Sequence, residues 1–137
     1  MTLPASPSGT APAVLELDAP AFTARIGGHP FAIVDFWAPW CAPCRAFAPV
    51  FEATAARHPD ILFAKVNTEQ EQEIAAHFGV RSIPTLMVFR DDIVVFAEAG
   101  ALPATALEEV IAAARALDMH EVRREIAMQE AAAGPAA

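Results

Sequence analysis

The sequence predicts an α/β protein with a mixed, five-stranded central sheet flanked by helices on both faces. Short apolar, β-prone runs alternate with longer helix-like segments, which implies parallel strands joined by crossover helices. Two late runs are separated only by Arg90-Asp91-Asp92, which predicts an antiparallel hairpin. An amphipathic segment from Pro103 predicts a last helix that packs against the sheet.

The first half of the chain predicts three strands and two helices. Residues 1–13 are rich in Pro, Ser, Ala and Thr and are expected to form a flexible tail. Asp18 is a candidate N-cap, and Gly27-Gly28 ends the helix that it starts. The expected elements are a strand over 14–17, a helix over 18–26, a central strand over 31–36, a helix over 41–57 and a strand over 61–66.

The second half predicts a third helix, the hairpin and the last helix. The segment Thr68-Glu69-Gln70-Glu71 has the pattern of a capping box, and Gly79 ends the helix that it opens. Strands are expected over 85–89 and 93–97, joined by a tight hairpin turn. A turn looser than two residues is the alternative, because Asp-Asp is poorer turn chemistry than Asn-Gly. The apolar stripe of the last helix is Leu107, Val110, Ile111, Ala114 and Leu117.

Length and composition favour one globular domain. The chain has 137 residues, is 55% hydrophobic and carries a net charge of −8, which argues against nucleic-acid or anionic-membrane partners. No apolar run approaches the roughly 20 residues of a membrane-spanning helix. No Lys or Arg precedes Arg25 and no apolar block stands there, so a secretory signal is not expected and a cytoplasmic location is favoured. The protein is also expected to be a monomer.

Residues 118–137 form an expected extension, helical to about residue 131 and disordered beyond it. Met119, Val122 and Ile126 share one stripe of this helix. The helix could extend the preceding one, contact a partner, or fold back on its own domain, and the last of these is the favoured expectation.

The only two cysteines, Cys41 and Cys44, are separated by two residues at a predicted strand-to-helix junction. Unpaired N–H groups at a helix start stabilise negative charge, and the thiolate is the reactive form of cysteine. Zinc sites also use this spacing, but they need further ligands nearby. The four histidines are scattered singly, so a redox pair is favoured and no metal is expected.

The chain resembles the thioredoxin family over about residues 14–117. The resemblance implies the thioredoxin fold and protein-disulfide reductase activity. Two features depart from the family pattern: Ala42 stands where glycine is usual, and the chain continues past the last helix. The matching motifs are Val34-Asp35-Phe36-Trp37-Ala38-Pro39-Trp40-Cys41-Ala42-Pro43-Cys44, Ala48-Pro49, Ala64-Lys65-Val66-Asn67, Gly79-Val80-Arg81-Ser82-Ile83-Pro84-Thr85-Leu86 and Gly100-Ala101-Leu102.

The resemblance assigns roles to four catalytic residues. Cys41, nearest the helix start and expected to be the more exposed thiol, attacks a substrate disulfide, and Cys44 resolves the mixed disulfide. Asp35 is the buried acid that accepts the Cys44 proton, with a pKa raised by burial. Lys65, the only lysine, is expected to pair with Asp35. From the residues alone, Asp35 could instead be structural and Lys65 an edge residue that snorkels to water.

The resemblance also implies a groove that binds substrate. Pro84 is expected to be cis, although trans is the general rule, and the Ile83 backbone offers strand-like hydrogen bonds to a peptide. Gly100 lines the groove where a side chain would obstruct approach; the alternative is a plain loop glycine. The resemblance also assigns substrate binding to Trp40, Ala42 and Pro43. It assigns structural support to Trp37 and Pro49.

No bound cofactor is expected beyond a redox-active Cys41–Cys44 disulfide. The resemblance implies reducing equivalents from NADPH through a thioredoxin reductase. It also implies client proteins with exposed disulfides, such as ribonucleotide reductase, peroxiredoxin and methionine sulfoxide reductase. Two alternatives remain: a disulfide oxidase or isomerase, and a thioredoxin-fold binding or chaperone module in which redox turnover is incidental.

Overall fold

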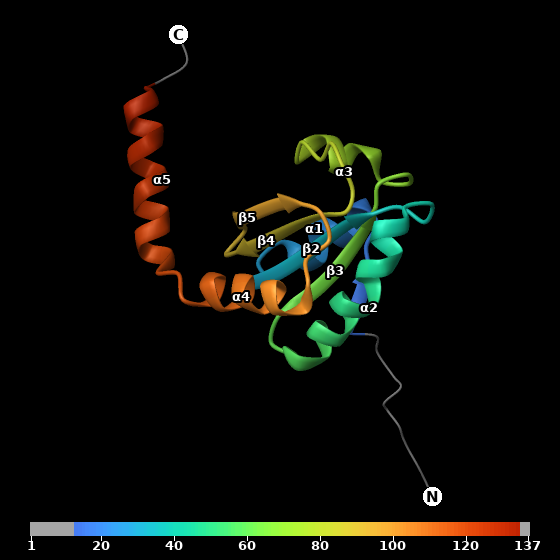
Figure 1. Ribbon diagram of the computed structural model, residues 1–137. Coiled ribbons are helices and arrows are strands. Elements are labelled where there is room, and N and C mark those ends of the chain that lie inside the picture. Colours follow the sequence, from blue (N-terminus) through green and yellow to red (C-terminus); the bar gives the residue numbers. More distant parts are fainter. Residues whose placement is uncertain (1–12, 135–137) are drawn as a thin grey trace, which may run out of the picture.

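The computed structural model describes residues 13–134 and confirms the predicted mixed sheet of five strands (Figure 1). The predicted tail lies almost wholly outside these residues. The strands lie side by side in the order β1-β3-β2-β4-β5. β1 and β2 both pair with β3 in parallel, and the hairpin strands β4 and β5 are antiparallel. Their bounds are β1 Val14–Glu16, β2 Phe31–Trp37, β3 Leu62–Asn67, β4 Thr85–Arg90 and β5 Ile93–Ala99.

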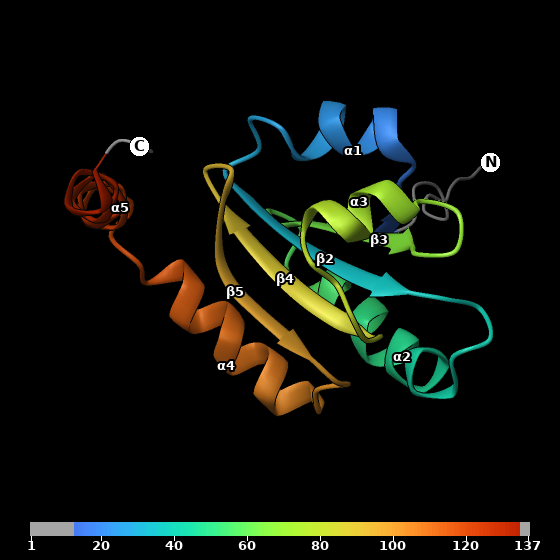
Figure 2. The ribbon, with the colours of Figure 1, turned by 90° about the horizontal axis from the view of Figure 1, so that it is seen from above.

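Helices cover both faces of the sheet (Figure 2). α1 (Ala19–Ile26) and α3 (Gln72–His77) lie on one face, and α2 (Ala42–Arg57) and α4 (Ala104–Arg115) on the other. Each face has its own core, because alternate residues of a strand point to opposite sides. The central strand β2 is buried throughout 31–36, as its apolar sequence predicts. The odd-numbered residues of β2 face α2 and α4, which decides the environment of Asp35.

The Asp18 cap is confirmed, but the capping box expected for α3 is wrong. The Asp18 carboxylate accepts the Ala21 N–H at 2.9 Å. α3 starts only at Gln72, because the Thr68 hydroxyl donates to the Trp37 carbonyl at 3.1 Å instead of capping a helix. The Glu71 carboxylate accepts the Ala19 N–H at 3.0 Å and so ties α3 to α1.

The hairpin turn is tight, as expected, and the alternative of a turn looser than two residues is wrong. Arg90 pairs with Ile93, so Asp91 and Asp92 alone make the turn, with φ of 52° and 68°. Aspartate tolerates this left-handed backbone better than most residues do. The Asp92 carboxylate accepts the Gly28 N–H at 3.0 Å, a tertiary contact that holds the turn closed.

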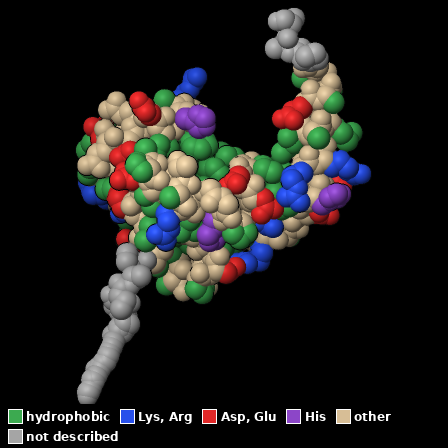
Figure 3. All heavy atoms as spheres, turned by 180° about the vertical axis from the view of Figure 1, so that it is seen from behind, with side chains coloured by type: hydrophobic (Ala, Val, Ile, Leu, Met, Phe, Trp, Pro, Cys, Tyr) green, Lys and Arg blue, Asp and Glu red, His purple; other side chains and the backbone are tan. Residues whose placement is uncertain are grey.

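The C-terminal extension forms a separate helix, α5 (Met119–Ala133), that stands away from the sheet (Figures 1 and 3). Met119 is its only buried residue within the described chain, and Arg123 pairs with Asp91 at 3.0 Å. The expectation that the extension packs on its own domain is therefore wrong for most of its length. Leu117, expected on the α4 stripe, lies beyond α4 and is 37% exposed. Residues 135–137 lie outside the described chain.

Candidate active site

The two cysteines lie where the loop after β2 enters α2. Cys41 is the N-cap of α2 and has extended backbone, and its Sγ accepts the Cys44 N–H at 3.2 Å. Ala42 and Pro43 occupy the first helical positions, where proline loses no intrahelical hydrogen bond. The cysteines are joined in a disulfide with a Cα–Cα distance of 5.2 Å. The helix start thus directs an N–H donor and the positive end of its dipole at the Cys41 sulfur.

Both cysteines are almost fully buried. Cys41 is 4% exposed and Cys44 2%, so Cys41 is the more exposed thiol, as expected, but only by a small margin. The pair packs with Ala38, and Trp37 and Ile83 lie against the same cluster. Cys41 Sγ lies 3.8 Å from the Ile83 carbonyl oxygen. Cys41 therefore lies directly beside the Ile83-Pro84 segment.

The Ile83-Pro84 peptide bond is cis, as predicted. The Pro84 carbonyl accepts the Gly100 N–H at 2.8 Å, which brings the loop after β5 against this segment. Gly100 has φ of +110°, and a Cβ built there would meet no atom within 4 Å. The backbone conformation, rather than crowding in this structure, is therefore what calls for glycine at position 100.

The two tryptophans occupy different surroundings. Trp40 is 65% exposed, and its Nε1 donates to the Glu69 carboxylate at 3.1 Å. Trp37 is half-buried against the cysteine cluster and donates to the Glu16 carboxylate at 3.1 Å. Pro49 is exposed within α2, and the helix continues through it.

Asp35 is 3% exposed, and its Oδ1 has no hydrogen-bond partner within the described chain. Burial raises the pKa of its carboxyl from 3.8 to about 7, which confirms the predicted direction. The Lys65 charge opposes this rise in the pKa, and the Glu16 charge adds to it. A carboxyl with this pKa can exchange a proton near neutral pH.

The expected ion pair between Lys65 and Asp35 is wrong. Lys65 lies beside Asp35 in the β2–β3 register, but its Nζ pairs with Glu16 Oε1 at 3.9 Å. The same Nζ lies 4.5 Å from the centre of the Trp37 ring. Lys65 therefore acts on Asp35 through its electric field and not through a direct bond.

Sequence reasoning missed Glu16 and Glu69, the two carboxylates that hold Trp37 and Trp40. Glu16 ends the short strand β1 next to Lys65, and this position was the only sign in the sequence that Glu16 belongs to the site.

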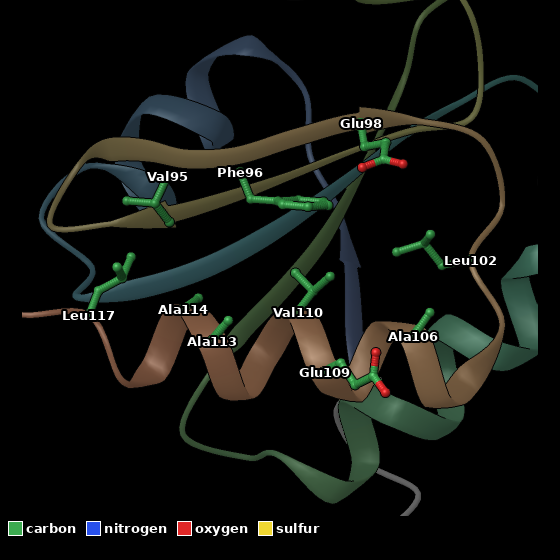
Figure 4. Close-up of a pocket in the computed structure, with 10 residues that line it drawn as sticks. All are labelled: Val95, Phe96, Glu98, Leu102, Ala106, Glu109, Val110, Ala113, Ala114 and Leu117. Carbon is green, nitrogen blue, oxygen red and sulfur yellow. The ribbon is translucent and has the colours of Figure 1, made fainter.

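An apolar groove of about 420 Å³ between β5 and α4 contains none of the predicted site residues (Figure 4). Within residues 13–134, no three His, Cys, Asp or Glu side chains cluster as a metal site would require, and no helix could span a membrane.

Comparison with known proteins decides the family. The family model described as Thioredoxin matches residues 13–113, which contain the whole site described above. The chain belongs to the thioredoxin family. A Streptomyces coelicolor relative, provisionally named thioredoxin 2, is 49% identical over 120 residues, covering 88% of this chain and 90% of the relative. Thioredoxin 1 of Synechococcus elongatus is 46% identical over 89 residues, or 64% of this chain and 78% of that one.

Solved thioredoxins share the fold. A mutant thioredoxin from Halobacterium salinarum superposes with a TM-score of 0.72 at 29% identity, covering 80% of this chain and 97% of that chain. Spinach chloroplast thioredoxin F (long form) gives a TM-score of 0.70 at 30% identity, with 75% and 87% covered. This thioredoxin is accordingly a dithiol-disulfide oxidoreductase whose redox centre is the Cys41–Cys44 pair, and such enzymes need no bound cofactor. Its partners are, in general terms, client proteins with disulfides and a reductase.

Proposed function

We propose that this chain is a general protein-disulfide reductase, recycled in the cytoplasm by a thioredoxin reductase that draws electrons from NADPH. The observation that carries the proposal is the placement of Cys41 Sγ. It receives the Cys44 N–H at the start of α2 and lies beside the Ile83 carbonyl. This setting favours a thiolate after reduction and leaves a peptide edge next to it.

In the proposed reaction, the Cys41 thiolate attacks one sulfur of a client disulfide. The client S–S bond breaks, a Cys41–client disulfide forms, and one client thiolate leaves. The Asp35 carboxylate, through a water molecule, takes the proton of the Cys44 thiol. The Cys44 thiolate then attacks Cys41 Sγ and releases the second client thiolate. The client gains two electrons, and the Cys41–Cys44 disulfide is the oxidised product.

The proposed client groove surrounds Cys41. The Ile83 backbone beside cis-Pro84 offers hydrogen bonds to an extended peptide, and Gly100 flanks it. Exposed Trp40 gives an apolar platform, and Ala42 and Pro43 are exposed at the start of α2. We infer that a monomer serves clients such as ribonucleotide reductase, peroxiredoxin and methionine sulfoxide reductase. Trp37 and Pro49 are proposed as structural support, and residues 14–117 as the catalytic domain.

Insulin reduction tests the proposal. Wild type is expected to reduce insulin with dithiothreitol, or with NADPH and thioredoxin reductase, and Cys41→Ser is expected to lose this activity. Cys44→Ser should stall as mixed disulfides with clients, because no second thiol is present to resolve them. A Cys41→Ser variant that kept full biological activity would instead support a binding or chaperone module. A wild type that failed to open the insulin disulfides would refute the reductase.

A further inference from the structure

Three charged side chains lie in one row across the sheet. Glu16 of β1 and Asp35 of β2 are both register partners of Lys65 on β3, which lies between them. Register partners in neighbouring strands point to the same face of a sheet. Trp37 follows Asp35 by two residues and shares that face. A single cation is thus placed between two carboxylates next to the cysteine loop.

Lys65 is held by the outer carboxylate. Its Nζ lies 3.9 Å from Glu16 Oε1, while Glu16 Oε2 accepts the Trp37 Nε1–H at 3.1 Å. The ammonium also lies 4.5 Å from the centre of the Trp37 ring, within cation–π range. Glu16, Lys65 and Trp37 therefore contact one another in a closed triangle. The inner carboxylate, Asp35, is left with a buried oxygen that has no hydrogen-bond partner in the described chain.

We propose that Glu16 is a positioning residue of this active site, which competes with Asp35 for the Lys65 ammonium and holds it on the β1 side of the row. The inference rests on the proposed role of Asp35 as proton acceptor. It assigns Glu16 no contact with substrate. Its effect reaches the reaction only through the charge that Asp35 experiences.

The charged groups around Asp35 are few. Lys65 acts from β3 and Glu16 from β1, while Leu86, the register partner on β4, is apolar. The cysteines on the α2 side do not titrate while they form a disulfide. Burial raises the pKa of Asp35, Lys65 lowers it and Glu16 raises it. Removing the Glu16 charge would act twice in one direction, by ending a repulsion and by freeing the ammonium to approach Asp35.

The oxidised protein allows Asp35 to be titrated without the thiols. The ¹³C chemical shift of the Asp35 side-chain carboxyl would be followed against pH in wild type and in Glu16→Gln, whose amide oxygen can still accept the Trp37 N–H. The Glu16→Gln midpoint is expected to fall by roughly one pH unit, at the low end of what an opposite charge within about 6 Å produces. Glu52→Gln removes an exposed carboxylate from α2 and should leave the midpoint unchanged.

A Lys65→Met background separates the two parts of the effect. There the Glu16→Gln shift should shrink, because no ammonium remains to move. Glu16→Asp should return the midpoint toward wild type and covers the case in which Glu16→Gln does not fold. An unchanged midpoint in folded Glu16→Gln, or an equal shift in both backgrounds, would overturn the proposal. If wild type failed to reduce insulin, only the proposed function would be refuted, since the titration of Asp35 does not depend on turnover.

Discussion

Replacing Asp35 with asparagine should remove most of the pH dependence that this carboxyl gives to folding. The folded state raises the pKa of Asp35 from 3.8 to about 7, so the folded protein binds this proton more tightly than the unfolded chain does. Stability from this group is therefore complete below the unfolded pKa and is lost as pH rises through the folded one. At about 1.4 kcal/mol per pKa unit, the total loss is about 4 kcal/mol.

Between pH 5 and pH 8 the same linkage gives a loss of about 3 kcal/mol in the free energy of unfolding. Urea unfolding of the oxidised protein at several pH values would measure it, with Glu52→Gln as the control for loss of an exposed carboxylate. Wild type should lose stability over this range relative to Asp35→Asn, so the variant should gain its advantage at alkaline pH. Parallel curves for the two proteins would show that Asp35 ionises like an exposed carboxyl and would refute the argument.

Two further predictions concern backbone conformation. Ala42→Gly should change the reduction potential by no more than about 20 mV. Alanine favours the helix start over glycine by about 0.5–1 kcal/mol, and only the part of this preference that differs between the dithiol and disulfide forms changes the potential. Equilibration against glutathione would measure the change, and a much larger one would contradict this account of Ala42. Gly100→Ala should cost about 1–2 kcal/mol in urea unfolding, because its φ of +110° disfavours a side chain although space is open; unchanged stability would show that the loop relaxes freely.

Local chemistry made most of the fold predictable. The apolar run of β2, the Asp18 cap and the cis-Pro84 segment were each correctly expected, the first two from side chains within one element and the third from the family resemblance. The errors arose where a side chain that was expected to bond within its own segment instead bonds to a residue far away in the sequence. Thr68 caps no helix because it bonds to the Trp37 carbonyl, which belongs to another strand.

The site shows the same division. Cys41 and Cys44 at a helix start, and a buried acid on the neighbouring strand, could be predicted from residue type and position. Which of the two carboxylates Lys65 pairs with could not be predicted, because the pairing depends on the register of β1 against β3. The burial of Cys41 likewise depends on Ile83, far along the chain, lying against it.

The position of α5 has a practical consequence. Figures 1 and 2 both place this helix across the sheet from the start of α2, and the bond from Arg123 to Asp91 steadies its base. Met128, near its outer end, is 63% exposed. A dye or resin attached at Met128 would leave the Cys41–Cys44 pair accessible to solution. Immobilised protein should therefore capture clients without a spacer between the resin and the chain.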